Sequence, residues 1–167
     1  MPILKKKILV IGCPGSGKST FSRALSEKTG LPLIHLDQLY WNTDRTTVEK
    51  QVFRRRLQDA LEGESWIIDG DYASTMELRL QRCDTVFFLD YPEEVCLSGV
   101  RDRVGKPRAD LPWTETGVDA ELIGVVRNYR RDKRPVVLKL LDRYADKEIH
   151  VLVSRREAAV FLENIAI

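Results

Sequence analysis

Residues 12–19 read Gly-Cys-Pro-Gly-Ser-Gly-Lys-Ser and follow the apolar run Ile-Leu-Val-Ile at 8–11. The run has the length and branching of a buried strand. Glycines at the G-x-x-x-x-G-K-S spacing let backbone N–H groups converge on an anion, so the pattern predicts a phosphate-binding loop between a strand and a helix. Lys18 is expected to reach the β- and γ-phosphates of ATP, and Ser19 to bind Mg²⁺.

The segment after Lys18 has the pattern of a helix. Phe21, Ala24 and Leu25 share one helical stripe, and Gly30 follows as a natural terminator. The loop would therefore sit at a helix N-terminus, where the helix dipole favours anions. We expect residues 12–20 to form the nucleotide-binding site. These residues are Gly12, Cys13, Pro14, Gly15, Ser16, Gly17, Lys18, Ser19 and Thr20.

The bulk composition predicts one soluble domain. The chain has 167 residues, 31% charged and 43% hydrophobic, and no apolar run approaches the ~20 residues of a membrane span. The order of residues at the N-terminus is wrong for a signal peptide, which favours the cytoplasm. A net charge of +2 argues against strong nucleic-acid binding. The oligomeric state, monomer or dimer, stays open.

Strand-like runs alternate with helical patterns along the chain. The runs lie at 8–11, 33–36, 66–68, 85–89 and 149–153, and the helical patterns at 48–61, 74–81, 93–104 and 155–163. This alternation predicts an α/β fold with three layers, a parallel sheet between two layers of helices. Capping boxes are expected at Thr46 with Glu49 and at Ser154 with Glu157. The turn-rich segment at 104–117 suggests a lid.

Acidic residues follow three of the predicted strands. In a parallel sheet, ligands bind beyond the carboxyl ends of the strands, where Asp37, Asp69 and Asp90 stand. We select Asp69 as a Mg²⁺ ligand because its strand should neighbour the strand before the loop. Asp37 would orient the acceptor hydroxyl or act as its base. Each carboxylate has an alternative role as a turn or helix cap, most plausibly Asp90.

Other polar residues carry weaker signals. Four arginines, at 127, 130, 131 and 134, would form a stripe on one helix, and Arg127 and Arg131 are our catalytic candidates, against the alternative of a solvated face. Arg54, Arg55 and Arg56 point about 100° apart and should face solvent. Cys13 has the position of a reactive thiol, although an inert one is favoured. His35 and His150 are expected to be packed in the core or to lie at a strand edge, rather than to bind zinc.

Six stretches together resemble the bacterial "DNA topology modulation" proteins, which are adenylate-kinase-like. They are the phosphate-binding loop and residues 35–41, 66–72, 84–92, 108–110 and 133–135. The resemblance covers nearly the whole chain in order. It implies a nucleoside-monophosphate-kinase fold with a five-stranded parallel sheet of order 2-3-1-4-5. It also implies that Arg103 and Arg108 contact the donor nucleotide and that Arg155 lies near its adenine.

Three functions fit these observations. The leading one is an ATP- and Mg²⁺-dependent phosphotransferase, a kinase that acts on a nucleotide, nucleoside or other small acceptor. The acceptor would bind on the helical segment at 38–64, between Asp37, Tyr40, Trp41 and Tyr72, whose rings could stack on a base or sugar or merely wall the core. The alternatives are a nucleotide-responsive regulator of DNA topology or gene expression, and a nucleotide-binding module that has lost catalysis.

Overall fold

The computed structural model describes residues 6–106, 117 and 119–165. Most of the predicted lid, with Arg108, lies outside the described residues. The helical segment at 38–64, on the expected acceptor side, lies wholly within the described residues.

Five parallel strands form the sheet, in the order β2-β3-β1-β4-β5, as predicted. The strands are β1 (Lys7–Gly12), β2 (Leu33–His35), β3 (Trp66–Asp69), β4 (Thr85–Leu89) and β5 (Glu148–Leu152). Leu9 of the central strand lies beside Ile68 on one side and Val86 on the other. Residues 8–11 are fully buried, because helices cover both faces of the sheet.

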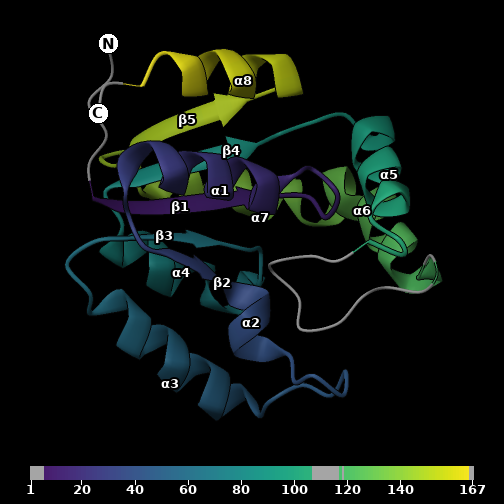
Figure 1. The fold of residues 1–167 in the computed structure, drawn as a ribbon, viewed down its shortest axis with the longest axis horizontal. Coiled ribbons are helices and arrows are strands. Elements are labelled where there is room, and N and C mark those ends of the chain that lie inside the picture. Colours follow the sequence, from purple (N-terminus) through teal and green to yellow (C-terminus); the bar gives the residue numbers. More distant parts are fainter. Residues whose placement is uncertain (1–5, 107–116, 118, 166–167) are drawn as a thin grey trace.

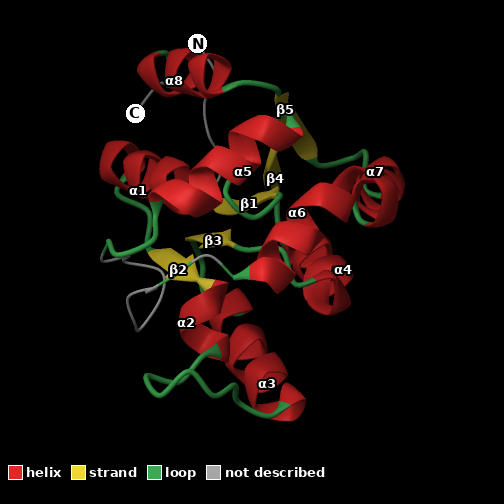
Figure 2. Cartoon of the chain, turned by 90° about the vertical axis from the view of Figure 1, so that its right-hand side faces the viewer, coloured by secondary structure: helices red, strands yellow, loops and turns green. Residues whose placement is uncertain are grey.

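Eight helices are present in the described residues. They are α1 (Lys18–Thr29), α2 (Leu36–Tyr40), α3 (Lys50–Leu61), α4 (Ala73–Arg82), α5 (Glu93–Asp102), α6 (Ala120–Asp132), α7 (Arg134–Arg143) and α8 (Arg155–Glu163). Helices α1 and α8 cover one face of the sheet, and α4 and α7 the other, which confirms the three layers (Figure 1). Figure 2 shows α2 and α3 beyond the β2 edge. Helix α3 packs on both α2 and α4.

Two predicted helix ends are confirmed. Helix α1 ends at Gly30, whose φ of 75° places it in the left-handed conformation and whose N–H bonds the Ser26 carbonyl. Helix α8 begins after Ser154, and the Ser154 hydroxyl accepts a hydrogen bond of 3.0 Å from the Glu157 N–H. Both ends follow from local chemistry that the sequence displays directly.

The capping box predicted at Thr46 is wrong. Helix α3 begins at Lys50, and its N-cap, Glu49, makes no side-chain capping bond. The Thr46 hydroxyl instead donates to Asp44 Oδ1 at 2.5 Å, and the Asp44 carboxylate also accepts the Thr46 N–H. Thr47 pairs with Trp41 in an isolated antiparallel bridge. These contacts therefore keep Thr46 in a loop that precedes α3, and Thr46 cannot cap the helix.

The single basic stripe predicted across residues 127–134 is also wrong. Helix α6 ends at Asp132, and Arg134 opens a second helix, α7. The cause is Pro135 in the first turn of α7, since proline has no N–H to continue a helix and its ring clashes with the preceding turn. Arg134 therefore lies on a different helix from Arg127 and Arg131.

In the part of the chain that the structure describes, every helix is too short or too polar to cross a bilayer.

Candidate functional site

The loop at 12–19 has the geometry that phosphate binding requires. Gly17, with φ of 95°, adopts a conformation that other residues rarely tolerate, and apart from its two chain neighbours no residue comes within 4 Å of where its Cβ would be. Gly15 instead packs against α5, because a Cβ there would lie 2.0 Å from the Cys96 carbonyl oxygen. The loop is thus held from behind by α5 and open in front, where an anion would sit.

Two polar side chains of the loop are placed for a phosphate ligand. Lys18 Nζ donates to the carbonyl oxygens of Gly12, at 2.9 Å, and Cys13, at 3.2 Å, so its amine lies across the loop. The Ser16 hydroxyl is buried and has no hydrogen-bond partner in the described part of the protein. A buried hydroxyl without a partner is costly, and it would be satisfied by a phosphate oxygen.

A cavity of about 1110 Å³ lies in front of the loop. Its walls include most of the site residues that the sequence predicts: residues 14–20, Asp37, Asp69, Arg103 and Arg155. Gly12 and Cys13 contribute their carbonyl groups to Lys18 but do not line the cavity. Arg127 and Arg131 are exposed and lie outside its lining, and Arg131 pairs with the neighbouring Asp132.

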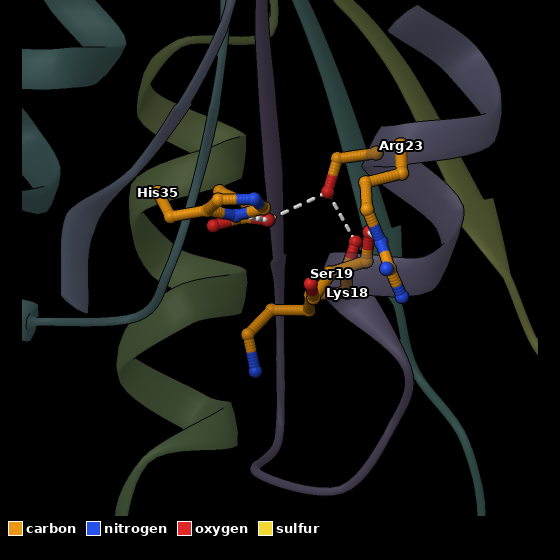
Figure 3. A network of polar contacts seen from close by, with 6 residues as sticks. Lys18, Ser19, Arg23 and His35 are labelled. Atoms are coloured by element: carbon orange, nitrogen blue, oxygen red, sulfur yellow. Dashed lines mark hydrogen bonds and ion pairs between the residues drawn. The ribbon is translucent and has the colours of Figure 1, made fainter. Parts of the chain in front are cut away.

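A buried polar network joins α1 to the end of β3 (Figure 3). Asp69 Oδ2 accepts hydrogen bonds from the Ser22 hydroxyl and from His35 Nδ1, each at 2.7 Å. The Ser22 hydroxyl also contacts the Lys18 carbonyl oxygen. Figure 3 shows His35 beside the start of α1, where Lys18 and Ser19 stand. His35 is packed in the interior, since it is 5% exposed.

The network leaves the residues predicted for Mg²⁺ in suitable positions. Ser19 and Asp69 both line the cavity. Both bonds to Asp69 use Oδ2, and within the described residues Oδ1 accepts no hydrogen bond. One hydroxyl and one carboxylate oxygen, completed by phosphate oxygens and water, form the oxygen-rich ligand set that Mg²⁺ prefers. The residues present therefore fit the metal.

The opposite end of the cavity is aromatic and acidic. Trp41 and Tyr72 line it, and the Tyr72 hydroxyl donates a hydrogen bond to Asp37. The Tyr40 ring packs against the Tyr72 ring, with centroids 4.9 Å apart, and against Phe53 at 5.2 Å. Burial, reinforced by the Asp37 carboxylate, raises the pKa of Tyr72, so the phenol stays a donor at neutral pH. Trp41 and Tyr72 face the cavity, while Tyr40 supports them.

Arg79, which the sequence did not single out, holds this end of the cavity together. Its guanidinium is fully buried and donates to three consecutive carbonyl oxygens, those of Gly70, Asp71 and Tyr72. Burial lowers its pKa to about 10, opposed mainly by the Asp71 carboxylate. Tyr72 has a φ of 32°, a strained value for a residue other than glycine. The three hydrogen bonds keep the turn in this conformation.

Several cationic side chains line the cavity. Besides Lys18, Arg103 and Arg155, they include Arg23, Lys106 and Lys133, which the sequence did not assign to the site. Asp71 is a further addition: it lines the cavity, and its Oδ1 lies 3.4 Å from the Gly12 nitrogen, which donates to it. Its place two residues beyond β3 was the only sequence signal for it.

Two residues that the sequence suggested for the site, Asp90 and Cys13, make contacts with other parts of the protein instead. Asp90 forms a paired salt bridge with Arg134, with distances of 2.9–3.1 Å, and lies outside the cavity lining. A hydrogen bond with the Cys96 thiol, together with burial, raises the pKa of Cys13, which is 4% exposed. The favoured interpretation of Cys13 as an inert thiol agrees with this environment, because a thiol needs a lowered pKa to react readily.

The chain is similar in sequence to one protein family and to one bacterial protein. Residues 8–124 match the model of a family described as an AAA domain. An uncharacterized protein, YqaC of Bacillus subtilis (strain 168), is 33% identical over 105 residues, which span 60% of this chain and 57% of the relative, little more than half of it.

Solved structures share the fold. A shikimate kinase from Acinetobacter baumannii in complex with shikimate superposes with a TM-score of 0.63 at 15% identity, over 95% of this chain and 89% of that one. A shikimate kinase from Bacteroides thetaiotaomicron gives 0.56 at 18%, over 93% of each chain. A sugar kinase from Janibacter sp. HTCC2649 gives 0.55 at 18%, over 96% and 91%. The chain thus has a phosphate-loop fold like that of small-molecule kinases.

Proposed function

This chain belongs to the AAA domain family, and we propose that it is a kinase that transfers the γ-phosphoryl group of ATP, with Mg²⁺, to a small acceptor. The observation that carries the proposal is the cavity itself. At one end it has a phosphate-binding loop with cations, and at the other a carboxylate, Asp37, beside two aromatic rings. A protein that only binds nucleotide has no need of the second end.

The donor would bind along the loop. Backbone N–H groups of residues 15–19 and Lys18 Nζ would surround its β- and γ-phosphates, as they do in phosphate-loop proteins generally. Ser19 and Asp69 would hold Mg²⁺, which offsets the charge of the phosphates when it is bound. Arg103 and Arg155 line the same cavity as the loop and would contact the nucleotide.

The acceptor would bind beside the hydrogen-bonded pair of Asp37 and Tyr72. Its hydroxyl oxygen forms a bond to the γ-phosphorus while the bond from that phosphorus to the β–γ bridging oxygen breaks, and ADP leaves with the electron pair. The hydroxyl proton would pass to Asp37, the carboxylate in the first turn of α2, just after β2. The Tyr72 hydroxyl bonded to Asp37 orients that carboxylate. Positioning and charge stabilisation supply most of the rate in such transfers.

Replacing Lys18 tests the proposal. We expect Lys18→Ala to lose at least tenfold in MgATP affinity by calorimetry and to abolish ADP formation that depends on an acceptor. MgATP should also raise the melting temperature of the wild type, because a ligand bound only to the folded state stabilises it. Lys139→Ala, an exposed lysine on α7, is the matched control. Equal ATP binding by wild type and Lys18→Ala would contradict the proposal.

We propose that the chain is a member of the DNA topology modulation group, on the residue patterns described above. The name of that group suggests a second function, a nucleotide-responsive regulator that binds DNA. Binding to a DNA duplex should then weaken steeply as salt rises. The net charge of +2 leads us to expect little binding at physiological salt, and the acceptor end of the cavity favours the kinase.

A further inference from the structure

The Asp69 carboxylate is held from the neighbouring strand of the sheet. Asp69 is the last residue of β3, and the register of the parallel strands pairs it with His35 of β2. His35 Nδ1 donates to Asp69 Oδ2 at 2.7 Å, and each of the two side chains is 6% exposed. A buried carboxylate is costly unless hydrogen bonds satisfy it, so this contact stabilises Asp69 in one orientation.

The same carboxylate is also held from α1. The Ser22 hydroxyl, which is fully buried, donates to Asp69 Oδ2 at 2.7 Å. Ser22 lies three residues after Ser19 and four after Lys18, so it neighbours both on the helix surface. Asp69 is therefore connected to the helix whose first turn carries the residues expected to hold the phosphates and Mg²⁺ (Figure 3).

The two oxygens of the Asp69 carboxylate have different surroundings. Both hydrogen bonds go to Oδ2, whereas Oδ1 accepts none from the described residues, and Asp69 lines the cavity. The Cβ–Cγ torsion of an aspartate is broad, so a carboxylate without partners rotates easily. Carboxylates that bind metals are themselves hydrogen-bonded, and these outer partners orient the oxygen that binds the metal.

We propose that Ser22 and His35 are positioning residues for Mg²⁺, because they hold Oδ2 of Asp69 and leave Oδ1 as the oxygen that binds the cation. This inference rests on the proposed kinase function, in which Ser19 and Asp69 hold Mg²⁺. Neither Ser22 nor His35 lines the cavity, so each acts through Asp69 and touches neither the metal nor the nucleotide.

A purely structural network has a different consequence. If the two hydrogen bonds only attach α1 to the sheet, their loss lowers the unfolding free energy and leaves metal binding intact. Loss of a partner that orients a metal ligand costs about 10- to 100-fold in metal affinity. The factor by which Mg²⁺ tightens nucleotide binding separates the two roles. It is a ratio measured within each variant, so a uniform loss of nucleotide affinity cancels.

Four variants and one nucleotide probe make the test. Calorimetry measures the dissociation constant of the non-hydrolysable ATP analogue AMPPNP in EDTA and again in saturating Mg²⁺. His35→Leu and Ser22→Ala each remove one hydrogen bond to Asp69. His35→Asn is the conservative variant, since its amide nitrogen can donate from the position of the histidine Nδ1. Thr85→Val is the matched control: it removes a buried hydroxyl that bonds Asp84 at 2.9 Å, outside the cavity lining.

We expect Mg²⁺ to tighten AMPPNP binding by the wild type about tenfold or more, because the metal links the nucleotide to Ser19 and Asp69. His35→Leu and Ser22→Ala should each lose most of this factor, while their affinities in EDTA stay close to that of the wild type. His35→Asn should retain most of the factor, and Thr85→Val all of it. Denaturant unfolding shows that each variant is folded and reports its loss of stability.

The inference is overturned if His35→Leu or Ser22→Ala retains the wild-type factor, or if Thr85→Val loses as much as they do. Should His35→Leu fail to fold, Ser22→Ala decides, since alanine is well tolerated in a helix. A wild type that binds AMPPNP equally with and without Mg²⁺ would overturn the inference and leave nucleotide binding in place. Failure to bind AMPPNP at all would overturn the kinase proposal as well, so the two failures are distinguishable.

Discussion

At the scale of single residues, the site depends on a strained turn that an arginine holds in place. Tyr72 is one of two residues other than glycine with a positive φ in the described chain, the other being Arg45. Both line the cavity. Strain of this kind persists only where surrounding contacts enforce it, and Arg79 supplies those contacts to Tyr72.

Replacing Arg79 with lysine should therefore destabilise the protein strongly. An ammonium group cannot reach three carbonyl oxygens in a fork, so buried acceptors lose their partners and the unfolding free energy should fall by about 3 kcal/mol. Denaturant unfolding measures this change. Arg82→Lys, at the exposed end of the same helix, is the control and should alter stability by less than about 0.5 kcal/mol. Equal effects would contradict the role of Arg79.

Asp37 should matter for turnover rather than for nucleotide binding. In Asp37→Asn, which keeps size but loses the proton acceptor, we expect kcat to fall about 10²- to 10⁴-fold and MgATP affinity to stay unchanged. Tyr72→Phe should give a smaller loss, because it only removes the hydrogen bond that orients the carboxylate. Steady-state kinetics with an accepted substrate check both variants, with Asp59→Asn on α3 as the control. An unchanged kcat in Asp37→Asn would exclude it as the base.

The site residues differ in how readily their roles can be predicted from the sequence. Lys18 and Ser19 could be identified because the loop motif fixes their roles locally. Arg79 and Lys133 could not, since a helical arginine or lysine looks the same whether it faces solvent, a cavity or buried carbonyl groups. Only the packing of α4 against the 70–72 turn separates Arg79 from its exposed neighbour Arg82.

At the scale of elements, helix boundaries follow local chemistry except where a competing contact intervenes. Pro135 divides the expected basic helix into α6 and α7. The division brings Arg134 to Asp90 at the end of β4, and so attaches the junction of the two helices to the sheet. It also leaves Lys133, the residue at the junction, on the wall of the cavity.

Of the two helix caps expected from the sequence, the one at Ser154 is present and the one at Thr46 is absent. Replacing each residue with alanine tests this difference. Ser154→Ala should lower the unfolding free energy by about 1 kcal/mol, because the Glu157 N–H loses its partner at the start of α8. Thr46→Ala should cost less than about 0.5 kcal/mol, because its hydroxyl bonds only within an exposed loop. Chemical denaturation of both variants gives the comparison. A larger loss for Thr46→Ala would mean that Thr46 does cap α3.

At the scale of the whole molecule, the parallel sheet brings distant segments to one edge. Asp37, Asp69 and the loop at 12–19 are far apart in the sequence, yet each lies at or just beyond the carboxyl end of a strand. Since β1 lies between β3 and β4, Asp69 comes beside the loop and Asp37 one strand farther away. The order of strands thus separates the donor end of the cavity from the acceptor end.

The buried thiols should make the fold sensitive to alkali. Burial raises the pKa of Cys83 from 9.0 to about 11, so between these values the unfolded chain loses a proton that the folded protein keeps. The unfolding free energy should therefore fall as pH rises from 9 to 11. Cys83→Ala should flatten this dependence, measured by urea unfolding across the range. A steeper fall in that variant would contradict the assignment.

The sequence by itself determined the phosphate-binding loop, the three-layer α/β fold and the carboxylates at the strand ends, because these depend on short motifs and on alternating apolar patterns. The tertiary structure alone decided which charges share the cavity. Arg79 is buried and donates hydrogen bonds to the 70–72 turn. Asp90 pairs with Arg134, and Asp71 and Lys133 line the cavity. The reason is physical: the role of a charged side chain depends on what packs against it, and those neighbours come from distant parts of the chain.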